Sequence, residues 1–452
     1  MRFLIALSLL ASPLLAADKM NVLFLMSDDM RPHLGCYGNQ QVKTPNIYAL
    51  AKAGVKFERA YVQYPLCNPS RASMLTGRYP TKTGVLDNLT WWGAAHPDWR
   101  SLPAWFKQHG YASLRCGKIF HGGIDDTAAW HEGADERKFE GAVNTKHKGQ
   151  DKNKSDQMIV LDEAGEANHG DTKTRLKAID YLERHKDQPF FLACGFTKPH
   201  SPPTAPKRFF DLYDPKDIPL PPDFAPRPAA PAGFPAPSIP ARNGDLFIER
   251  DATPDAAKEM IRAYHASLTW VDWNVGEVLA ALDRLKLRDK TIVVFWGDHG
   301  YHLGEKGKWS KHNSLFDTGT HVPMIIHAPG RKGNGTASPR IVEALDIYPT
   351  LSALCGLPAQ EGLQGDSLVP LLENPAAAWD RPALSVTKLN GNLLGRTVRT
   401  DRWRYAEWGD GGEQGAMLID EQNDPDELKN LVSDPAHAEI VKELKAALDR
   451  LK

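Results

Sequence analysis

The sequence has almost no net charge and few cysteine residues. Its formal net charge is -1, so no overall field draws the chain to nucleic acid or to an anionic membrane, and any anion-binding site must be local. Five cysteines are too few for a disulfide framework, and their odd number leaves at least one unpaired. We therefore expect neither nucleic acid nor a membrane among the partners.

Long apolar runs are also scarce, and the one that stands out lies at the N-terminus. It follows the positive residue Arg2 and precedes the small residues Ala16 and Ala17. This pattern is typical of a secretory signal peptide over residues 1–17, and the run is too short for a good membrane span. A buried N-terminal helix is the alternative interpretation. The pattern predicts a secreted or periplasmic protein.

Proline is unevenly distributed, because residues 202–240 contain 13 of the 34 prolines. Such a segment cannot form a regular helix or a central strand. It is either a disordered linker or an ordered excursion on the surface. We favour the excursion, since Phe209, Phe210, Leu212 and Tyr213 offer apolar anchors.

Elsewhere the composition is ordinary for a globular protein, and 452 residues suffice for one large domain with an appendage, or for two domains. Apolar runs that read as buried strands alternate with helical patterns, which predicts an α/β fold with a mainly parallel sheet covered on both faces. The expected strands are 21–27, 111–115, 189–196, 291–296 and 322–327. The expected helices are 45–53, 70–76, 102–109, 258–285 and 346–355.

The pattern changes near residue 376. Residues 396–408 alternate between polar and apolar side chains, a short strand is expected at 416–420, and an amphipathic helix at 439–451. We therefore expect a main domain over residues 18–375 and a small C-terminal α+β subdomain with an antiparallel sheet over residues 376–452.

Two pairs of polar residues follow predicted strands. Asp28 and Asp29 end the first strand, and Asp298 and His299 follow the strand at 291–296. Adjacent acids repel each other unless a cation neutralises them, and carboxylate oxygens favour calcium or magnesium. Each pair alone is also compatible with a solvated turn. Together they favour a metal site.

Cys67 opens the segment CNPSRASMLTGR, in which a helix is predicted to begin. The start of a helix attracts anions through its dipole and its free N–H groups, and Arg71 adds a fixed cation one turn later. The segment could therefore hold a tetrahedral oxyanion beside a reactive atom. The alternative is a buried structural cysteine, which most free cysteines are.

Four further basic residues are candidates for binding the same anion: Lys118, His121, His200 and Lys311. Any one of them is more often an ordinary surface residue. They become informative only if they converge on a single anion.

The pattern C-x-P-S-R from Cys67 to Arg71, continuing as Leu-Thr-Gly-Arg, is similar to the signature of type I sulfatases. Other segments follow the order of that family, and His299 stands where most sulfatases have Asn, so the chain most resembles the iduronate-2-sulfatase branch. The resemblance implies an alkaline-phosphatase-like sandwich. The segments concerned are NVLFLMSDDMRPHLGCYGN, GYASLRCGKIFH, FFLACGFTKPHSP and VVFWGDHGYHLGEKGKWSKH.

The resemblance also implies a cofactor and its ligands. Cys67 would be converted to formylglycine by a formylglycine-generating or sulfatase-maturating enzyme. Asp28, Asp29, Asp298 and His299, with the modified Cys67, would hold one Ca²⁺ ion.

The same resemblance assigns roles to the basic residues. Arg71 would hold the hydrated formylglycine, and Lys118 and Lys311 would bind the sulfate oxygens. His200 would protonate the leaving alcohol, and His121 would help to expel sulfate by removing a proton.

The expected activity is hydrolysis of a sulfate ester on a sulfated carbohydrate, a 2-O-sulfated uronic acid or a related polysaccharide unit. The alternatives are a sulfatase for another polysaccharide or for a small sulfate ester, and a phosphatase or phosphodiesterase of the same fold. A non-catalytic carbohydrate-binding relative is a further alternative. The C-terminal part is shorter than in the lysosomal enzyme and the proline-rich stretch matches poorly, so the sugar is left open.

Overall fold

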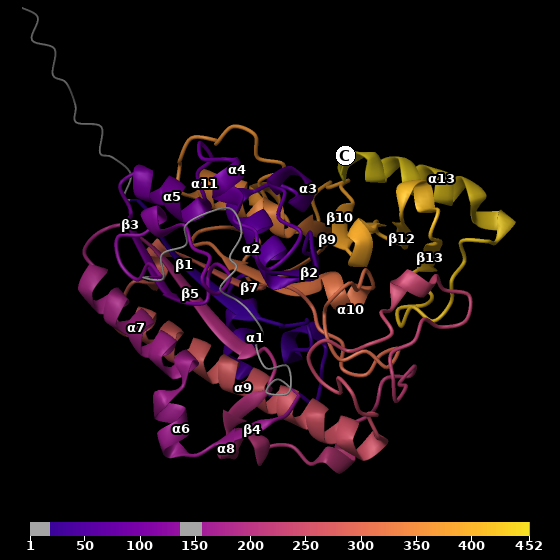
Figure 1. Cartoon of the computed structure of the whole chain (residues 1–452). Helices are drawn as coiled ribbons and strands as arrows, with labels where there is room; N and C mark the ends of the chain where they lie inside the picture. The colour runs from indigo at the N-terminus through magenta and orange to yellow at the C-terminus, as the bar shows by residue number, and fades with distance from the viewer. Residues whose placement is uncertain (1–18, 136–155, 452) are drawn as a thin grey trace, which may run out of the picture.

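A seven-stranded sheet lies at the centre of the protein, which we describe from a computed structural model that covers residues 19–135 and 156–451 (Figure 1). The predicted signal peptide lies outside these residues. Six of the seven strands run in one direction, and only β8 is antiparallel to its neighbours. The mainly parallel sheet is thus confirmed. In spatial order the strands are β3 (Ala112–Gly117), β5 (Phe190–Pro199), β1 (Asn21–Asp28), β7 (Thr291–Gly297), β8 (His321–His327), β2 (Val55–Tyr61) and β9 (Ala337–Glu343).

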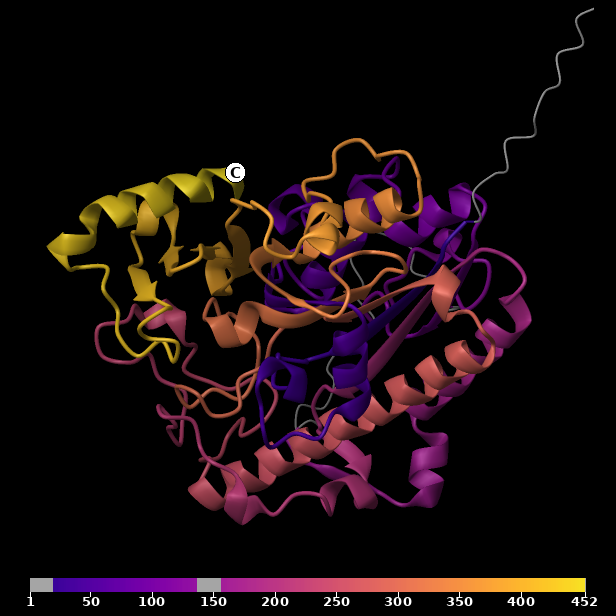
Figure 2. The same cartoon turned by 180° about the vertical axis from the view of Figure 1, so that it is seen from behind.

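Helices cover both faces of this sheet, as β1 illustrates. All eight residues of β1 are buried, and its side chains alternate between the two faces. Leu23 and Leu25 pack on the side of α1, α7 and α9, whereas Phe24 and Met26 pack on the side of α2, α5 and α11. Figures 1 and 2 show the two groups on opposite sides of the sheet. Their bounds are α1 (Pro45–Ala53), α7 (Gly170–His185), α9 (Pro254–Arg284), α2 (Cys67–Thr76), α5 (Leu102–Gln108) and α11 (Ile347–Leu354).

The carboxyl ends of the central strands meet at one edge of the sheet, where sites form in open α/β folds. Strand β1 ends at Asp28, and β7 ends one residue before Asp298. Strand β5 runs three residues beyond its predicted end, to Pro199, because Asp28 pairs with Pro199 after a bulge. His200 therefore follows directly at the same edge.

Helix α2 begins at Cys67, three residues before the predicted start. Pro69 does not prevent this, because the N–H groups of a first helical turn have no partner within the helix. Cys67 is therefore the first residue of α2, and Gly77 ends the helix in a left-handed conformation with φ 65°.

The proline-rich segment 202–240 is ordered on the surface. Phe209, Phe210 and Tyr213 are buried and pack with Trp270 of α9. Leu212, the fourth expected anchor, was predicted wrongly: it lies in the turn after α8, where its side chain is 41% exposed. Short elements in and around the segment are β4 (Ile159–Leu161), β6 (Thr204–Pro206), α6 (Glu163–Asn168) and α8 (Lys207–Phe210).

A second sheet, antiparallel throughout, stands near the C-terminus. Residues 396–408, predicted as one alternating segment, form two strands because the chain reverses at Thr400, whose hydroxyl accepts a hydrogen bond from the Trp403 amide at 3.1 Å. Helix α13 packs on the sheet through Leu444. The strands and helix are β10 (Ala383–Lys388), β11 (Leu394–Arg399), β12 (Trp403–Trp408), β13 (Ala416–Asp420) and α13 (Ala438–Ala447).

The predicted domain boundary at residue 375 falls in the connection between α12 and β10, and it stays a prediction. Short helices complete the structure: α3 (Pro80–Thr83), α4 (Trp92–Ala95), α10 (Asp317–Thr320) and α12 (Val369–Glu373). All five cysteines are free thiols. In residues 19–135 and 156–451, no helix is both long enough and apolar enough to cross a bilayer.

Candidate active site

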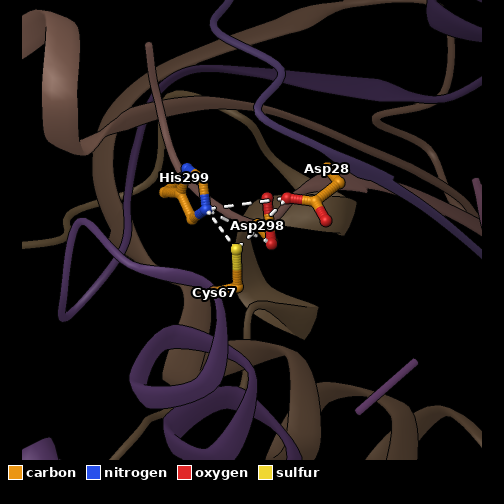
Figure 3. Close-up of side chains that lie close together, drawn as sticks. All are labelled: Asp28, Cys67, Asp298 and His299. Atoms are coloured by element: carbon orange, nitrogen blue, oxygen red, sulfur yellow. Dashed lines mark hydrogen bonds and ion pairs between the residues drawn. The ribbon is translucent and has the colours of Figure 1, made fainter. Parts of the chain in front are cut away.

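Four side chains from three elements converge at the carboxyl edge of the central sheet (Figure 3). Asp28 ends β1, Asp298 and His299 follow β7, and Cys67 begins α2. Their ligand atoms all lie within 4.8 Å of one another. The sulfur of Cys67 is 3.2 Å from Nε2 of His299 and 3.4 Å from Oδ1 of Asp28. All four residues are buried.

The helix start contributes positive potential to this cluster. Cys67 itself is only 1% exposed, and its side chain sits over the first turn of α2. The amide of Asn68 donates to Oδ1 of Asn88 at 3.0 Å, and the hydroxyl of Ser70 donates to the Asp298 carbonyl. The Ser70 bond ties the first turn to the residue that follows β7, and the Asn68 bond ties it to the segment around Asn88, so the start of the helix dipole faces the carboxylates.

The guanidinium of Arg71 contacts two carboxylates of this cluster. Its Nε donates to Oδ2 of Asp298 at 2.8 Å, and NH1 donates to the carbonyls of Lys118 and Ile119. Burial disfavours the charge, but Asp298 and Asp28 outweigh it and raise the pKa of Arg71 above its ordinary value. Arg71 is therefore a fixed cation that joins α2 to the loop after β3.

The two lysines predicted from the sequence also reach the acidic pairs. Lys118 contacts Oδ2 of Asp28, and Nζ of Lys311 lies 3.0 Å from Oδ1 of Asp29. Burial lowers and the neighbouring carboxylates raise the pKa of Lys311, and the net direction is well upward. Both ammonium groups therefore remain charged at the edge of the cluster.

Asp29 belongs to a second, overlapping group with Asp28, Cys67 and His200, whose ligand atoms again lie within 4.8 Å of one another. Burial raises the pKa of Asp29 to about 7. Its backbone has φ 61°, a left-handed conformation unusual for a residue with a side chain, and its carbonyl accepts a hydrogen bond from the Tyr264 hydroxyl at 2.6 Å.

These residues fit a hard divalent cation. Oδ1 of Asp29 is buried and accepts no hydrogen bond, although Lys311 is close to it. Three buried carboxylates in one cluster need positive charge, and carboxylate oxygen is the preferred ligand of calcium. Burial lowers the pKa of His299, but Asp298 and Cys67 raise it to about 10. A bound cation would take the place of that proton, since a ligating imidazole is neutral.

The two candidate acid–base histidines differ in position. His200 follows β5, and its Nδ1 is 2.7 Å from the Ser201 carbonyl. Burial and then Lys311 hold the pKa of His200 well below its usual range. His121 lies half-buried in the loop after β3, three residues from Lys118, and belongs to neither metal group.

Two acids near the site were not predicted from the sequence. Oδ2 of Asp245 lies 3.3 Å from Nζ of Lys311. The carboxylate of Asp171, at the start of α7, accepts hydrogen bonds from the amides of Thr197 and Lys198 and so fixes the backbone before His200. Asp245 lies in an irregular segment with no periodicity, so only the fold could bring it here. For Asp171 the available signal was its place at a helix start.

The comparisons with known proteins agree with this site. The chain matches the sulfatase family over residues 20–357, and residues 304–452 match a family described as N-sulphoglucosamine sulphohydrolase, C-terminal. Because the first match covers most of its length, the chain belongs to the sulfatase family. The protein is a sulfuric ester hydrolase.

Comparison with individual relatives shows which sulfatases this chain resembles. Iduronate 2-sulfatase of Mus musculus is 35% identical over 399 residues, which cover 79% of this chain and 72% of the relative. A sulfatase of Formosa agariphila is 32% identical and covers 96% of this chain and 87% of its own. A solved 2-O GAG sulfatase has a TM-score of 0.70 at 25% identity, covering 96% of this chain and 92% of that one. The predicted resemblance and the alkaline-phosphatase-like fold are confirmed.

Proposed function

We propose that this sulfatase removes sulfate from a sulfated carbohydrate, a 2-O-sulfated uronic acid or a related polysaccharide unit. The nucleophile is formylglycine made from Cys67. The observation that carries the proposal is the place of Cys67 as the first residue of α2, with its sulfur 3.4 Å from Asp28 and 3.2 Å from His299. A cysteine that served packing alone would not be surrounded by three buried carboxylates and a buried guanidinium.

One Ca²⁺ ion would be held by Asp28, Asp29, Asp298 and His299 together with the modified residue 67. When bound, calcium would lower the pKa of the hydrated formylglycine and orient the sulfate for attack. Oδ1 of Asp29 is buried and accepts no hydrogen bond, which supports this ligand set.

The fixed cations of the chain stabilise the charge that develops on sulfate. Lys118 contacts Asp28 and Lys311 contacts the adjacent Asp29, so both ammonium groups can turn to sulfate oxygens placed beside residue 67. Arg71, held by Asp298 and two carbonyls, stays in place and orients the hydroxyl groups of residue 67.

His200 supplies the proton to the leaving alcohol. Its Nδ1 is engaged with the Ser201 carbonyl, so Nε2 is the atom that exchanges the proton. Burial favours the neutral ring, but the negative charge of a bound sulfate ester favours the protonated ring and so raises the pKa of His200 when substrate is present. His121 removes the proton that permits sulfate to leave residue 67.

The substrate class is supported by the named relatives, one an iduronate 2-sulfatase and one a 2-O GAG sulfatase. The signal peptide predicted over residues 1–17 supports a secreted or periplasmic enzyme, whose second partner is the enzyme that converts Cys67.

A substrate panel tests the proposal. The protein is co-produced with a formylglycine-generating enzyme and given a 2-O-sulfated uronic acid disaccharide, a 6-O-sulfated glucosamine disaccharide, an aryl sulfate and an aryl phosphate. Ion chromatography measures the sulfate or phosphate released. We expect the fastest release from the 2-O-sulfated disaccharide and far less phosphate than sulfate. Faster phosphate release would favour a phosphatase, and faster release from the glucosamine sulfate would assign another sugar.

A further inference from the structure

His200 stands in a segment, residues 198–203, that has few backbone donors of its own. Pro199, Pro202 and Pro203 belong to it, and a proline has no N–H group. Buried carbonyl groups need hydrogen-bond donors, so a segment of this kind depends on side chains to supply them. The direction of the His200 ring therefore depends on which side chain supplies those donors.

The ammonium group of Lys198 supplies two of these hydrogen bonds. Its Nζ donates to the His200 carbonyl at 2.7 Å and to the Pro202 carbonyl at 2.9 Å. Lys198 is only 7% exposed, so these bonds stand in for the water that surrounds a lysine on the surface. The side chain thus bends back over its own segment and holds two carbonyl groups in place.

The carbonyl group between these two orients the His200 ring. Nδ1 of His200 lies 2.7 Å from the Ser201 carbonyl oxygen. An imidazole whose Nδ1–H donates to a carbonyl presents Nε2 as its reactive atom. Because Nζ of Lys198 holds the carbonyl groups on both sides of the Ser201 carbonyl, the lysine controls the direction in which Nε2 points.

The backbone of Lys198 is itself fixed from two sides. Its amide donates to Oδ2 of Asp171 at 2.9 Å, and its carbonyl accepts a hydrogen bond from the Ser27 hydroxyl at 2.7 Å. Asp171 lies in the first turn of α7, and Ser27 precedes Asp28 on β1. The lysine side chain therefore starts from a backbone position that is fixed relative to the strand that carries Asp28.

Lys198 differs from the two sulfate-binding lysines in what its ammonium group contacts. Lys118 and Lys311 contact the carboxylates of Asp28 and Asp29, and a bound cation would take over the neutralisation of these carboxylates. The ammonium group of Lys198 is instead engaged by backbone carbonyl groups, whose need for a donor is the same with and without a cation. These contacts suit a positioning role and not sulfate binding.

We propose that Lys198 is the positioning residue of the general acid: its ammonium group holds the turn after β5 so that Nε2 of His200 faces the leaving oxygen. The inference rests on the proposed function, in which His200 protonates the leaving alcohol. It adds that Lys198 acts on catalysis through His200 alone, without contact to the substrate.

A double-mutant cycle tests this dependence. Lys198→Met, His200→Ala and the double variant are compared with the parent on the sulfated disaccharide and on the aryl sulfate, after the thermal stability of each has been measured. Lys198→Met keeps a long, flexible side chain but removes the N–H donors. Lys207→Met, 73% exposed on α8, is the matched control and should keep the rates of the parent.

We expect Lys198→Met to lower kcat on the disaccharide about 10–100-fold, because a misplacement of about 1 Å can cost that much. Its rate on the aryl sulfate should change less than about threefold, because a nitrophenolate leaves without a proton. Introduced into His200→Ala, the same substitution should change the rate by less than about twofold, since the group it positions is gone.

Lys198→Gln is the second variant, because it keeps an N–H donor on a shorter side chain. On the disaccharide its kcat should lie between those of the parent and Lys198→Met. If Lys198→Met does not fold, Lys198→Gln takes its place in the cycle, with a smaller loss that is again confined to the disaccharide and absent from the His200→Ala background.

Where His200→Ala shows its larger loss on the disaccharide, three results would overturn the positioning role: an unchanged rate in Lys198→Met, an equal loss on both substrates, or a loss that multiplies in the double variant. Failure of the proposed function gives a different result, because His200→Ala then loses as much on the aryl sulfate. The double variant still tests Lys198 in that case: an additional loss over His200→Ala contradicts the inference, and equal rates support it.

Discussion

Two clusters of buried charge in this protein look alike in composition but differ in what they do. The active-site cluster holds Arg71 among Asp28, Asp29 and Asp298. The second, which we call the Arg404 cluster, holds Arg404 among Asp317, Glu421 and Glu427, where β12 of the C-terminal sheet meets α10. Both arginines are fully buried.

The difference lies in where the polar atoms point. Arg404 donates to Glu421 at 2.5 Å, to Asp317 at 2.8 Å and to the Leu315 carbonyl, so its fork is used within the protein. Each cluster leaves one buried carboxylate oxygen without a hydrogen bond, Oδ1 of Asp29 in the active-site cluster and Oε1 of Glu427 in the Arg404 cluster. In the active-site cluster NH2 of Arg71 has none either, and the ligand atoms of four residues that include Cys67 lie within 4.8 Å of one another. Buried charge alone therefore does not mark a catalytic site; convergence of ligand atoms on one point does.

The largest effect is expected from Asp298→Asn, which removes a ligand charge and weakens the Arg71 contact. Activity should fall about 10³-fold or more, and the thermal stabilisation that calcium gives should disappear with it. Bound metal is measured by mass spectrometry of the purified protein and stability by thermal unfolding with and without calcium. Asp211→Asn, 53% exposed beside Lys207, is the matched control and should keep both. Full activity in chelated, metal-free protein would contradict the assignment.

His200→Ala should separate substrates by their leaving groups. A sugar alkoxide needs a proton as it departs, whereas a nitrophenolate does not, so the loss should reach about 10²–10⁴-fold on the sulfated sugar and be small on the aryl sulfate. His437→Ala, in the C-terminal part, controls for loss of an imidazole. Equal losses on both substrates would move the acid to His121.

The Arg404 cluster should respond in stability instead of catalysis. Arg404→Met leaves buried carboxylates without their cation and should lower the free energy of unfolding by about 3–5 kcal/mol, while the folded fraction keeps its kcat. Arg402→Met is the control. The Arg402 side chain is 47% exposed, so its ion pair with Asp420 should contribute less than about 1 kcal/mol to stability. Loss of kcat in folded Arg404→Met would show that the Arg404 cluster also acts in catalysis, which contradicts the difference drawn between the clusters.

The smallest effect concerns pH. Burial raises the pKa of Glu427 in the folded state to about 8, whereas the pKa of a glutamate in the unfolded chain is about 4.3. Between these two pH values the folded state keeps the proton and the unfolded state has lost it. Stability therefore falls as pH rises from about 5 to 8, and Glu427→Gln should reduce that fall by about 1 kcal/mol or more. Urea unfolding at both pH values measures it, with Glu439→Gln, 88% exposed on α13, as control. Equal pH slopes in parent and Glu427→Gln would contradict the assigned titration.

The fold was predictable where burial leaves a periodic pattern. Helix α1 and strand β13 have the predicted bounds, and the apolar runs of β1 and β7 differ by a single residue at one end. Strands β2 and β9 received no assignment, because Glu58 and Arg340 interrupt the apolar pattern. The register and direction of the strands were not predictable either, because no local feature of the β8 sequence indicates that this strand is antiparallel to its neighbours.

The candidate site residues were predicted from strand-end positions and from the family resemblance, and the fold brings several of them to one place. Parallel strands end at one edge, so Asp28, Asp298 and His200 meet there whatever the loops between them do. Asp245 was not predicted, because it reaches Lys311 from an irregular segment that has no periodic pattern.

The central claim is that residue 67 is the nucleophile, and turnover by Cys67→Ala tests it most directly. The parent and Cys67→Ala are both co-produced with the formylglycine-generating enzyme and assayed on an aryl sulfate, which does not need the general acid. We predict no turnover above background in Cys67→Ala, with thermal unfolding close to that of the parent and calcium still bound, more weakly, by the four remaining ligands. Sulfate release by folded Cys67→Ala at a rate near that of the parent would contradict the mechanism.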